Sequence, residues 1–349
     1  MNNPLEAVDQ LIKDTNKKFG KDTLGYSPST LDLDFISTGS LALDIAIGGG
    51  QMLMGIPHGR MTEIWGPKAT GKSTLGNHII ANAQAQGKTT ALFDYEQTYD
   101  PVYATAIGVD PNKLLLGQYD QLEQGWQIME AFMRTIKDCL IVVDSLPMMT
   151  PRAEHEGEMG DHHPGLQPRL LGQAMRRNTG WVRKNNIALV VINQVRHKLN
   201  VRNPKYERSE TQPGGEAFKH AVDLQINLGL GKTNREGDDP VSSIIRAYIQ
   251  FNKIAKPYGK AEYNILFGKG IDKVADLMEV APACGAIDQR GHYYYVGEEK
   301  IANGKDAFFT WLENPENFEK IYQEAVKIMS KAEVKDEEDK TSKTSKEKD

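Results

Sequence analysis

Short runs of apolar residues alternate with helix-length segments between residues 61 and 192. The runs occupy residues 61–65, 90–93, 114–116, 140–143 and 188–192. Within each run the hydrophobicity is continuous, which is typical of strands that are buried on both faces of a sheet. The sequence therefore predicts an α/β fold in which helices cover a mainly parallel central sheet.

The pattern changes after residue 215. Three further runs, at residues 222–230, 243–251 and 261–267, alternate between apolar and polar positions and follow one another closely. Alternation at every second residue is typical of antiparallel strands. We expect these strands to extend the same sheet.

The N-terminal segment is predicted to lie outside this core. Residues 4–18 place apolar side chains on one face at helical spacing, and residues 20–34 are rich in turn-forming types. A lone helix of this length is only marginally stable in water. Packing on the chain's own core and docking on a neighbouring subunit both remain open.

The C-terminal part divides into an ordered and a polar segment. Residues 271–330 predict a small α/β domain, whereas residues 331–349 are almost wholly polar and bury too little apolar surface to order themselves. The predicted parts are an N-terminal helix and linker for subunit packing (1–34), a core (35–270), a small domain (271–330) and a disordered charged tail (331–349).

Composition restricts the possible functions only in part. The chain has 349 residues, of which 39% are apolar, and a net charge of -5. No run of about 18 apolar residues occurs, so we expect no membrane partner. The two cysteines lack metal-ligand spacing and suit a reducing compartment such as the cytoplasm. Because the net charge is negative, any nucleic-acid site must be a local concentration of Lys and Arg.

A phosphate-binding motif follows the first predicted strand. Residues 66–73 match G-x-x-x-x-G-K-[ST] and open a helix-forming run. In such a loop, backbone N–H groups approach phosphate oxygens near a helix N-terminus, the lysine reaches the outer phosphates, and the hydroxyl ligates Mg²⁺. The candidate nucleotide-binding residues here are Gly66, Pro67, Lys68, Ala69, Thr70, Gly71, Lys72, Ser73 and Thr74.

Two other predicted strands end in carboxylates. Asp144 closes an apolar strand, as expected of a second Mg²⁺ ligand beside Ser73. Asp94 and Glu96 follow another strand, and a carboxylate there could orient a water that attacks the terminal phosphate. A solvated loop position is the alternative for Glu96.

Two polar, glycine-containing segments interrupt the core. Residues 154–165 carry carboxylates and three histidines, but their spacing matches no familiar metal-ligand pattern, so a mobile loop is favoured over a metal site. Residues 196–215 interleave Lys and Arg with Leu199 and Tyr206. Cations can neutralise phosphates while apolar and aromatic groups stack on bases, although a merely solvated charged loop remains the alternative.

Taken in order, these segments resemble the bacterial RecA recombinases over roughly residues 35–330. The matching stretches are residues 37–41, 66–73, 142–145, 156–161, 192–196, 214–215 and 252–255. The resemblance implies a P-loop RecA-like ATPase core with an N-terminal helix and a small C-terminal domain. It also implies ATP-dependent homologous recombination and DNA repair by a helical filament on single-stranded DNA, which pairs with homologous duplex DNA and hydrolyses ATP with Mg²⁺.

The resemblance also implies roles for single residues. Glu96 corresponds to the water-activating carboxylate, and Gln194 to the γ-phosphate sensor at the base of the second DNA loop. Asp100 and Tyr103 correspond to adenine-side contacts, and Lys253 to a lysine that reaches a neighbouring subunit's nucleotide. The implied DNA-binding residues are Arg169, Arg176, Arg196, Lys198, Leu199, Arg202, Gly214 and Gly215.

Several positions depart from the family pattern, as in a divergent, for example bacteriophage-type, member. Phe251 stands where the family has the first of two interface lysines, and the second loop carries three extra residues. Two alternatives follow: a RecA-fold motor such as a helicase, and a non-hydrolysing DNA-coating mediator, which Phe251 keeps open. Intact Lys72 and Glu96 oppose the second.

Overall fold

The computed structural model describes residues 4–20, 23–26, 33–158, 161, 163–197, 210–211 and 213–345. The chain divides into two compact units, residues 1–33 and 34–349. The first contains α1 (Pro4–Phe19). The segment after this helix folds back on it, because the Tyr26 hydroxyl donates to Asp9 at 3.0 Å and the Asn16 side chain bonds both main-chain groups of Leu24.

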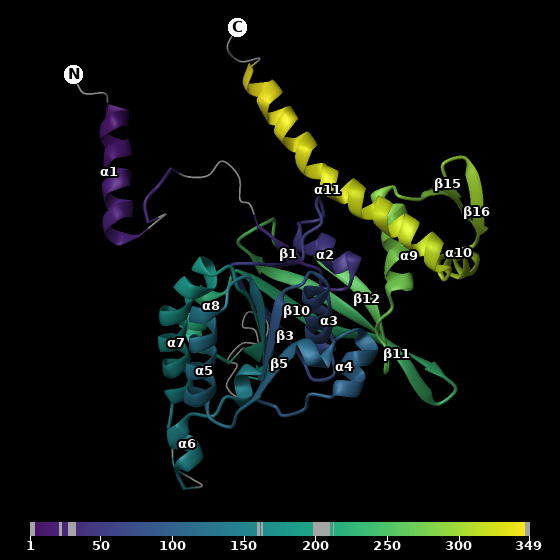
Figure 1. The fold of residues 1–349 in the computed structure, drawn as a ribbon. Helices are drawn as coiled ribbons and strands as arrows, with labels where there is room; N and C mark the ends of the chain where they lie inside the picture. Colours follow the sequence, from purple (N-terminus) through teal and green to yellow (C-terminus); the bar gives the residue numbers. More distant parts are fainter. Residues whose placement is uncertain are drawn as a thin grey trace, which may run out of the picture. The chain divides into compact units, whose positions relative to one another are not determined.

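A nine-stranded sheet forms the centre of the second unit (Figure 1), in the order β13-β12-β11-β10-β3-β7-β6-β4-β5. Its parallel strands are β3 (Arg60–Gly66), β4 (Thr89–Asp94), β5 (Leu114–Gln118), β6 (Cys139–Asp144), β7 (Ala188–Gln194) and the start of β10 (Leu224–Glu236). The antiparallel extension comprises β11 (Asp239–Asn252), β12 (Lys260–Leu266) and β13 (Gly270–Ile271). The predicted parallel sheet with an antiparallel extension is confirmed.

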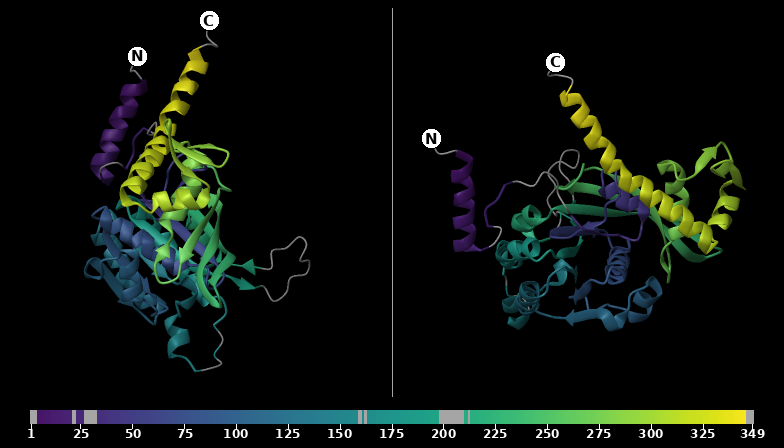
Figure 2. Two further views of the ribbon diagram at one scale, coloured as in Figure 1. Left: turned by 90° about the vertical axis from the view of Figure 1, so that its right-hand side faces the viewer. Right: turned by 45° about the horizontal axis from the view of Figure 1, so that its top comes forward.

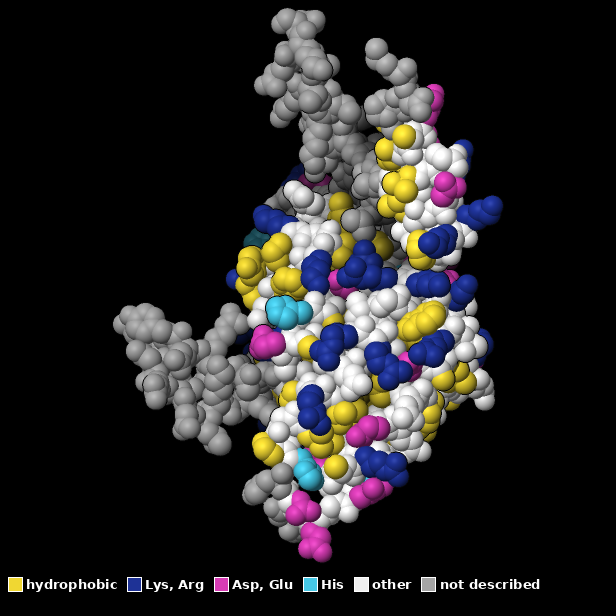
Figure 3. Space-filling view, turned by 90° about the vertical axis from the view of Figure 1, so that its left-hand side faces the viewer, with side chains coloured by type: hydrophobic (Ala, Val, Ile, Leu, Met, Phe, Trp, Pro, Cys, Tyr) yellow, Lys and Arg dark blue, Asp and Glu magenta, His cyan; other side chains and the backbone are white. Residues whose placement is uncertain are grey.

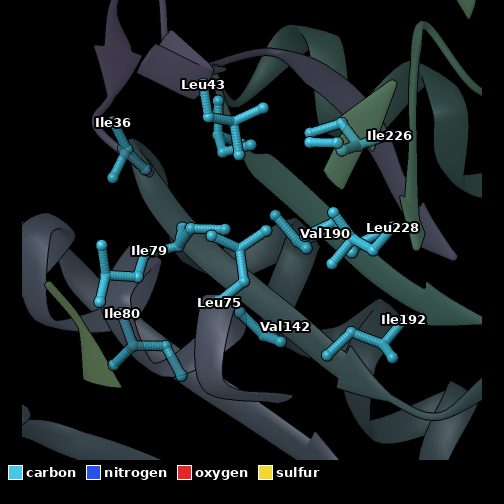
Figure 4. Close-up of a cluster of buried hydrophobic side chains, with 14 of the residues drawn as sticks. Ile36, Leu43, Leu75, Ile79, Ile80, Val142, Val190, Ile192, Ile226 and Leu228 are labelled. Atoms are coloured by element: carbon cyan, nitrogen blue, oxygen red, sulfur yellow. The ribbon is translucent and has the colours of Figure 1, made fainter. Parts of the chain in front are cut away.

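Helices cover both faces of the sheet, and each face has its own apolar layer. One layer includes α2 (Leu41–Ile47), α3 (Lys72–Ala85) and α4 (Pro101–Ile107), and the other includes α5 (Leu122–Thr135), α7 (Leu166–Lys184) and α8 (Gly215–Ala221). Strand β6 contributes side chains to both apolar layers: Val142 packs in the first layer (Figure 4), whereas Ile141 and Val143 pack in the second. Burial on both faces explains its continuous hydrophobicity.

Shorter elements connect these layers. They are β1 (Phe35–Ile36), β2 (Ile56–Pro57), the 3-10 turns η1 (Pro111–Lys113) and η2 (Leu146–Met148), α6 (Arg152–Glu156), β8 (Arg196–His197) and β9 (Glu210–Thr211). The β8–β9 pair leads out from the body of the unit (Figure 2). Among the described residues, none of the helices is both long and apolar enough to cross a lipid bilayer.

The C-terminal elements surround a third apolar cluster, which also includes Leu41 of α2. They are α9 (Lys273–Cys284), β14 (Asp288–Arg290), β15 (Tyr293–Val296), β16 (Glu299–Asn303), α10 (Lys305–Leu312) and α11 (Pro315–Ser345). Tyr294 stacks on Phe308 with ring centroids 4.3 Å apart. That residues 271–330 form a separate domain stays a prediction, because residues 34–349 make one compact unit.

The last helix differs from the sequence prediction. Helix α11 continues to Ser345, where a disordered tail is expected from residue 331. That expectation considered only how little apolar surface the tail can bury. Its Ala, Glu and Lys residues are strong helix formers, and a helix needs no apolar burial to make its own backbone hydrogen bonds.

A buried carboxylate joins α9 to α2. Asp276 is 5% exposed, and it accepts hydrogen bonds from the Ser40 hydroxyl at 2.8 Å and from the backbone N–H groups of Leu41 and Ala42. The first N–H groups of a helix have no partner within the helix. Asp276 therefore caps α2 from another part of the chain.

Replacing this carboxylate should destabilise the fold. We expect Asp276→Ala to lower the free energy of unfolding by roughly 2–4 kcal/mol, because buried donors lose their acceptor. Urea unfolding followed by circular dichroism measures the change. Glu279→Ala is the matched control in the same helix: its side chain is 63% exposed, so its effect should stay within about 0.5 kcal/mol. Equal losses in the two variants would contradict the capping role.

The neighbouring buried carboxylate predicts a pH dependence. Burial raises the pKa of Asp44 to about 7, although hydrogen bonds from Ser37 and Thr38 oppose the rise. The folded protein therefore keeps a proton that the unfolded chain releases near pH 4, so the free energy of unfolding should fall as the pH rises from about 4 to 7. Urea titrations across this range should show a weaker fall in Asp44→Asn; an unchanged slope would contradict the assignment.

Candidate functional site

The phosphate-binding motif forms the turn between β3 and α3, as predicted. Gly71 has a φ of 74°, a left-handed conformation that favours glycine. A Cβ at Gly71 would lie 2.4 Å from the Ile265 side chain, and one at Gly66 would lie 2.2 Å from the Leu228 carbonyl oxygen. The glycines thus let the loop pack directly on β10 and β12.

Lys72 lies folded back over this loop. Its ammonium group donates to the Pro67 carbonyl oxygen at 2.7 Å, and the residue is 9% exposed. Burial lowers the pKa of Lys72, while the carboxylates of Asp144 and Glu96 act in the opposite direction. A phosphate oxygen that took the place of the Pro67 carbonyl would give this cation a stronger, charged acceptor.

The two predicted Mg²⁺ ligands lie side by side. The Ser73 hydroxyl donates to the Asp144 carboxylate at 2.6 Å. Burial raises the pKa of Asp144 to about 6, and the Ser73 hydrogen bond lowers it in part. A hydroxyl and a carboxylate are the hard oxygen donors that suit Mg²⁺, which usually completes its shell with water and substrate phosphates. The residues present therefore fit this ion.

The candidate water-activating carboxylate touches side chains from two other strand ends. Glu96 accepts a hydrogen bond from the Ser145 hydroxyl at 2.5 Å and from the Gln194 amide at 2.6 Å, both at the same oxygen. Asp94 is only 2% exposed and accepts from the Tyr99 backbone N–H at 3.0 Å. Of the two carboxylates, Glu96 is the one that faces the main cleft.

A cleft of about 840 Å³ collects most of the predicted nucleotide site. Its lining includes Lys68, Ala69, Gly71, Lys72, Ser73, Thr74, Glu96, Asp144 and Gln194. Tyr103 also lines it and bonds Thr74 through the two hydroxyl groups at 3.0 Å. Asp100 lines the adjoining hollow instead and caps α4 by accepting from the Val102 and Tyr103 backbone N–H groups.

Sequence reasoning missed an aromatic wall of this cleft. Phe267 follows β12, lines the cleft and is 48% exposed. An exposed aromatic ring beside a nucleotide site is suited to stacking on a base. The sequence could have indicated this residue, because Phe267 is an aromatic residue at the end of an otherwise alternating run, directly before Gly268.

The two ends of the second loop are tied together by a buried side chain that sequence reasoning also missed. The Asn193 amide donates to the Glu63 carboxylate at 2.7 Å and to the Pro213 carbonyl at 3.0 Å. Burial raises the pKa of Glu63 to about 7.

Arg196 begins β8, which pairs with β9. The predicted DNA contacts Lys198, Leu199 and Arg202 lie outside the described residues.

The end of this loop packs against α7, which carries two predicted DNA contacts. Gly215 has a φ of 74°, and a Cβ there would lie 3.0 Å from Pro168; the adjacent Gly214 has a φ of 112°. Arg169 and Arg176 are both exposed on α7. Lys and Arg side chains gather on the face that carries α5, α7 and α8 (Figure 3). That this face is the local concentration of positive charge expected of a nucleic-acid site stays a prediction.

No metal cluster accompanies the first loop in the part of the chain that the structure describes. Residues 152–156 form α6, in which Arg152 pairs with Glu156 at 2.8 Å. No three His, Cys, Asp or Glu side chains gather there to bind a metal, although His162 lies outside the described residues. His163 and Pro164 instead line a surface hollow with Arg169.

Lys253 does not line the nucleotide cleft of its own chain. Its ammonium group donates to the carbonyl oxygens of His220 at 3.1 Å and Val222 at 2.8 Å, at the end of α8. The Asp223 carboxylate lies 3.3 Å away, and the Phe251 ring centroid 5.6 Å away. The side chain of Lys253 is 39% exposed, and its predicted contact with a neighbouring subunit stays a prediction.

Comparison with known proteins agrees with this geometry. Residues 6–272 match the family model described as the RecA N-terminal domain. The chain is 42% identical to Protein RecA of Thermus aquaticus over 324 residues, which cover 91% of this chain and 93% of the relative. It is 40% identical to Protein RecA of Deinococcus radiodurans over 320 residues, which cover 90% of this chain and 86% of the relative. The chain therefore belongs to the RecA family of ATP-dependent recombination and DNA-repair proteins, which are DNA-dependent ATPases.

Proposed function

We propose that this chain assembles as a helical filament on single-stranded DNA, binds ATP with Mg²⁺, and promotes pairing and strand exchange with homologous duplex DNA. The observation that carries the proposal is the 2.6 Å hydrogen bond from Gln194 to Glu96. Gln194 ends β7, immediately before the second DNA loop, so one side chain touches both the hydrolytic carboxylate and the base of a DNA-binding segment. ATP and DNA as ligands also imply a cytoplasmic location.

Each residue of the cleft has a distinct role in this proposal. The Lys72 ammonium and the backbone N–H groups of residues 66–74, except Pro67, which has none, bind the phosphates. Ser73 and Asp144 hold Mg²⁺, which neutralises phosphate charge when bound. Tyr103 and Phe267 border the base, and Asp100 fixes Tyr103 by capping α4.

Hydrolysis requires that Glu96 be released from Gln194. The γ-phosphate offers the Gln194 amide another anionic acceptor, which carries more negative charge and more acceptor oxygens than the Glu96 carboxylate. Glu96 can then accept a proton from a water aligned on the γ-phosphorus, while Ser145 holds the carboxylate in place. Movement of Gln194 shifts the base of the second loop, which couples nucleotide state to DNA.

Assembly would complete the site. Lys253 of one protomer would stabilise the charge on the nucleotide of the next, as cations do in phosphoryl transfer. Helix α1 exposes Val8, Leu11 and Phe19 at 41%, 58% and 67%, an apolar surface suited to docking on a neighbouring protomer. Residues 169, 176, 196, 198 and 202 would neutralise DNA phosphates, Leu199 would contact bases, and Gly214 and Gly215 would allow close backbone approach.

The first test is ATP hydrolysis with and without single-stranded DNA. Wild type should be stimulated strongly, whereas Lys72→Ala and Glu96→Gln should each lose at least about 100-fold, because each removes a group that acts on the reacting phosphate. Glu96→Gln should still bind nucleotide in a fluorescence titration. Hydrolysis that ignores DNA would instead favour a motor ATPase, and DNA binding without hydrolysis in wild type would favour a coating protein.

The proposed DNA face predicts a salt dependence. Arg176→Ala should weaken binding to single-stranded DNA and reduce the slope of log affinity against log salt by about 0.7, the loss of one phosphate contact. Arg177→Ala is the matched control, because the neighbouring Arg177 pairs with Glu130 at 2.8 Å. Fluorescence anisotropy at several salt concentrations measures both slopes. An unchanged slope in Arg176→Ala would remove this residue from the DNA site.

A further inference from the structure

Four groups surround the ammonium of Lys253, and we call them the Lys253 cradle: the carbonyl oxygens of His220 and Val222, the Asp223 carboxylate and the Phe251 ring. Three of the four come from the end of α8 and the residues that follow it. The fourth stands where the family has another lysine. The cradle thus holds one lysine, Lys253, at a place where the family pattern has two.

The cradle leaves part of the ammonium available. A lysine ammonium has three N–H donors and no acceptor. Two donors bond the carbonyls of His220 and Val222, at 3.1 and 2.8 Å. The side chain remains 39% exposed, so a donor can still reach an anion that approaches from outside the protomer.

Asp223 is the rigid part of the cradle. It is 2% exposed; its backbone N–H donates to the Met61 carbonyl, and its own carbonyl accepts from the Lys253 backbone N–H, both at 2.9 Å. These bonds join it to β3 and to the end of β11. A buried carboxylate at 3.3 Å attracts the cation more strongly than an exposed one would, because water screens it less.

The cradle is also connected to the second DNA loop. Helix α8 begins at Gly215, directly after that loop, and ends at Ala221, beside the carbonyls that hold Lys253. A displacement of the loop end that moves this short helix also moves two of the acceptors on the ammonium. The lysine therefore follows the position of α8.

We propose that Asp223 and Phe251 are positioning residues that hold Lys253 for the nucleotide of a neighbouring protomer, and that α8 transmits the state of the second DNA loop to it. The inference rests on the proposed contact of Lys253 with that nucleotide. In this chain the Asp223 carboxylate and the Phe251 ring hold Lys253 in place. This fixed position compensates for the absence of a second interface lysine, since Phe251 occupies its place.

The first variant to test is Asp223→Asn, which keeps the shape of the side chain and removes its charge. DNA-stimulated hydrolysis should lose about tenfold in kcat with little change in KM, because the nucleotide is bound mainly by the other protomer. Phe251→Leu should lose about threefold, since it removes only a cation–π contact. Arg183→Gln is the matched control: it removes the other cation of Asp223, at 3.4 Å, and should stay within about twofold of wild type.

Mixed filaments separate a positioning role from a folding defect. Lys72→Ala has an intact cradle but a defective nucleotide site, and Asp223→Asn has the reverse. In an equal mixture on single-stranded DNA, about a quarter of the head-to-tail interfaces combine the two intact halves. Hydrolysis should therefore rise several-fold above the sum of the separate variants, with co-assembly established by capture of one tagged variant. Co-assembly without this rise overturns the inference.

The variant Lys253→Ala distinguishes the positioning role of Asp223 from the proposed contact of Lys253 with the neighbouring protomer's nucleotide. If Lys253→Ala keeps full DNA-stimulated hydrolysis, the proposed contact between protomers fails, and the cradle has no role in hydrolysis. If Lys253→Ala loses hydrolysis while Asp223→Asn retains the wild-type kcat, the contact stands and the positioning role is wrong. Loss in both, with rescue in the mixture, supports the inference.

Discussion

The parallel register of four central strands is the constraint on which the site depends. Strands β3 and β7 pair Gly66 with Gln194, and strands β4 and β6 pair Asp94 with Asp144. Because parallel strands end at the same edge of a sheet, segments that are far apart in the sequence deliver their last residues to one place. The positions of the phosphate-binding motif, of the proposed Mg²⁺ ligands and of the proposed glutamine sensor all follow from this alignment.

Polar side chains, rather than apolar ones, connect the site to its surroundings. Glu63 and Asn193 join two central strands to the end of the second loop, and Asp276 joins the C-terminal elements to α2. A buried hydrogen bond depends on direction as well as distance, so it transmits a displacement more specifically than apolar packing does. Such groups are expensive to bury unless every donor has an acceptor. Buried polar groups between functional elements therefore indicate that the relative position of those elements matters.

The sequence predicts the parts of this protein that depend on local pattern. Continuous apolar runs give the buried strands, and the spacing from Gly66 to Ser73 gives the phosphate loop, because both reflect one segment and its immediate geometry. Glu63, Asn193 and Phe267 escape such reasoning, since their importance comes from partners that only the folded sheet brings near. The cradle escapes it for the same reason. The prediction for the C-terminal tail differs from the structure for the opposite reason. There the composition suggests disorder, whereas local helix propensity favours the continuation of α11 to Ser345.

The tie between Asn193 and Pro213 has a consequence for how the second loop can change. With its ends held together by a hydrogen bond at 3.0 Å, the intervening chain is a closed loop, and the entropy of closing it grows only with the logarithm of its length. Three additional residues in a loop of this size cost on the order of 0.1 kcal/mol. The length of the segment between residues 193 and 213 can therefore change at little cost, while Asn193 keeps its hydrogen bonds to Glu63 and Pro213. A single amide side chain, that of Asn193, thus separates the proposed hydrolytic site from the proposed DNA-binding loop.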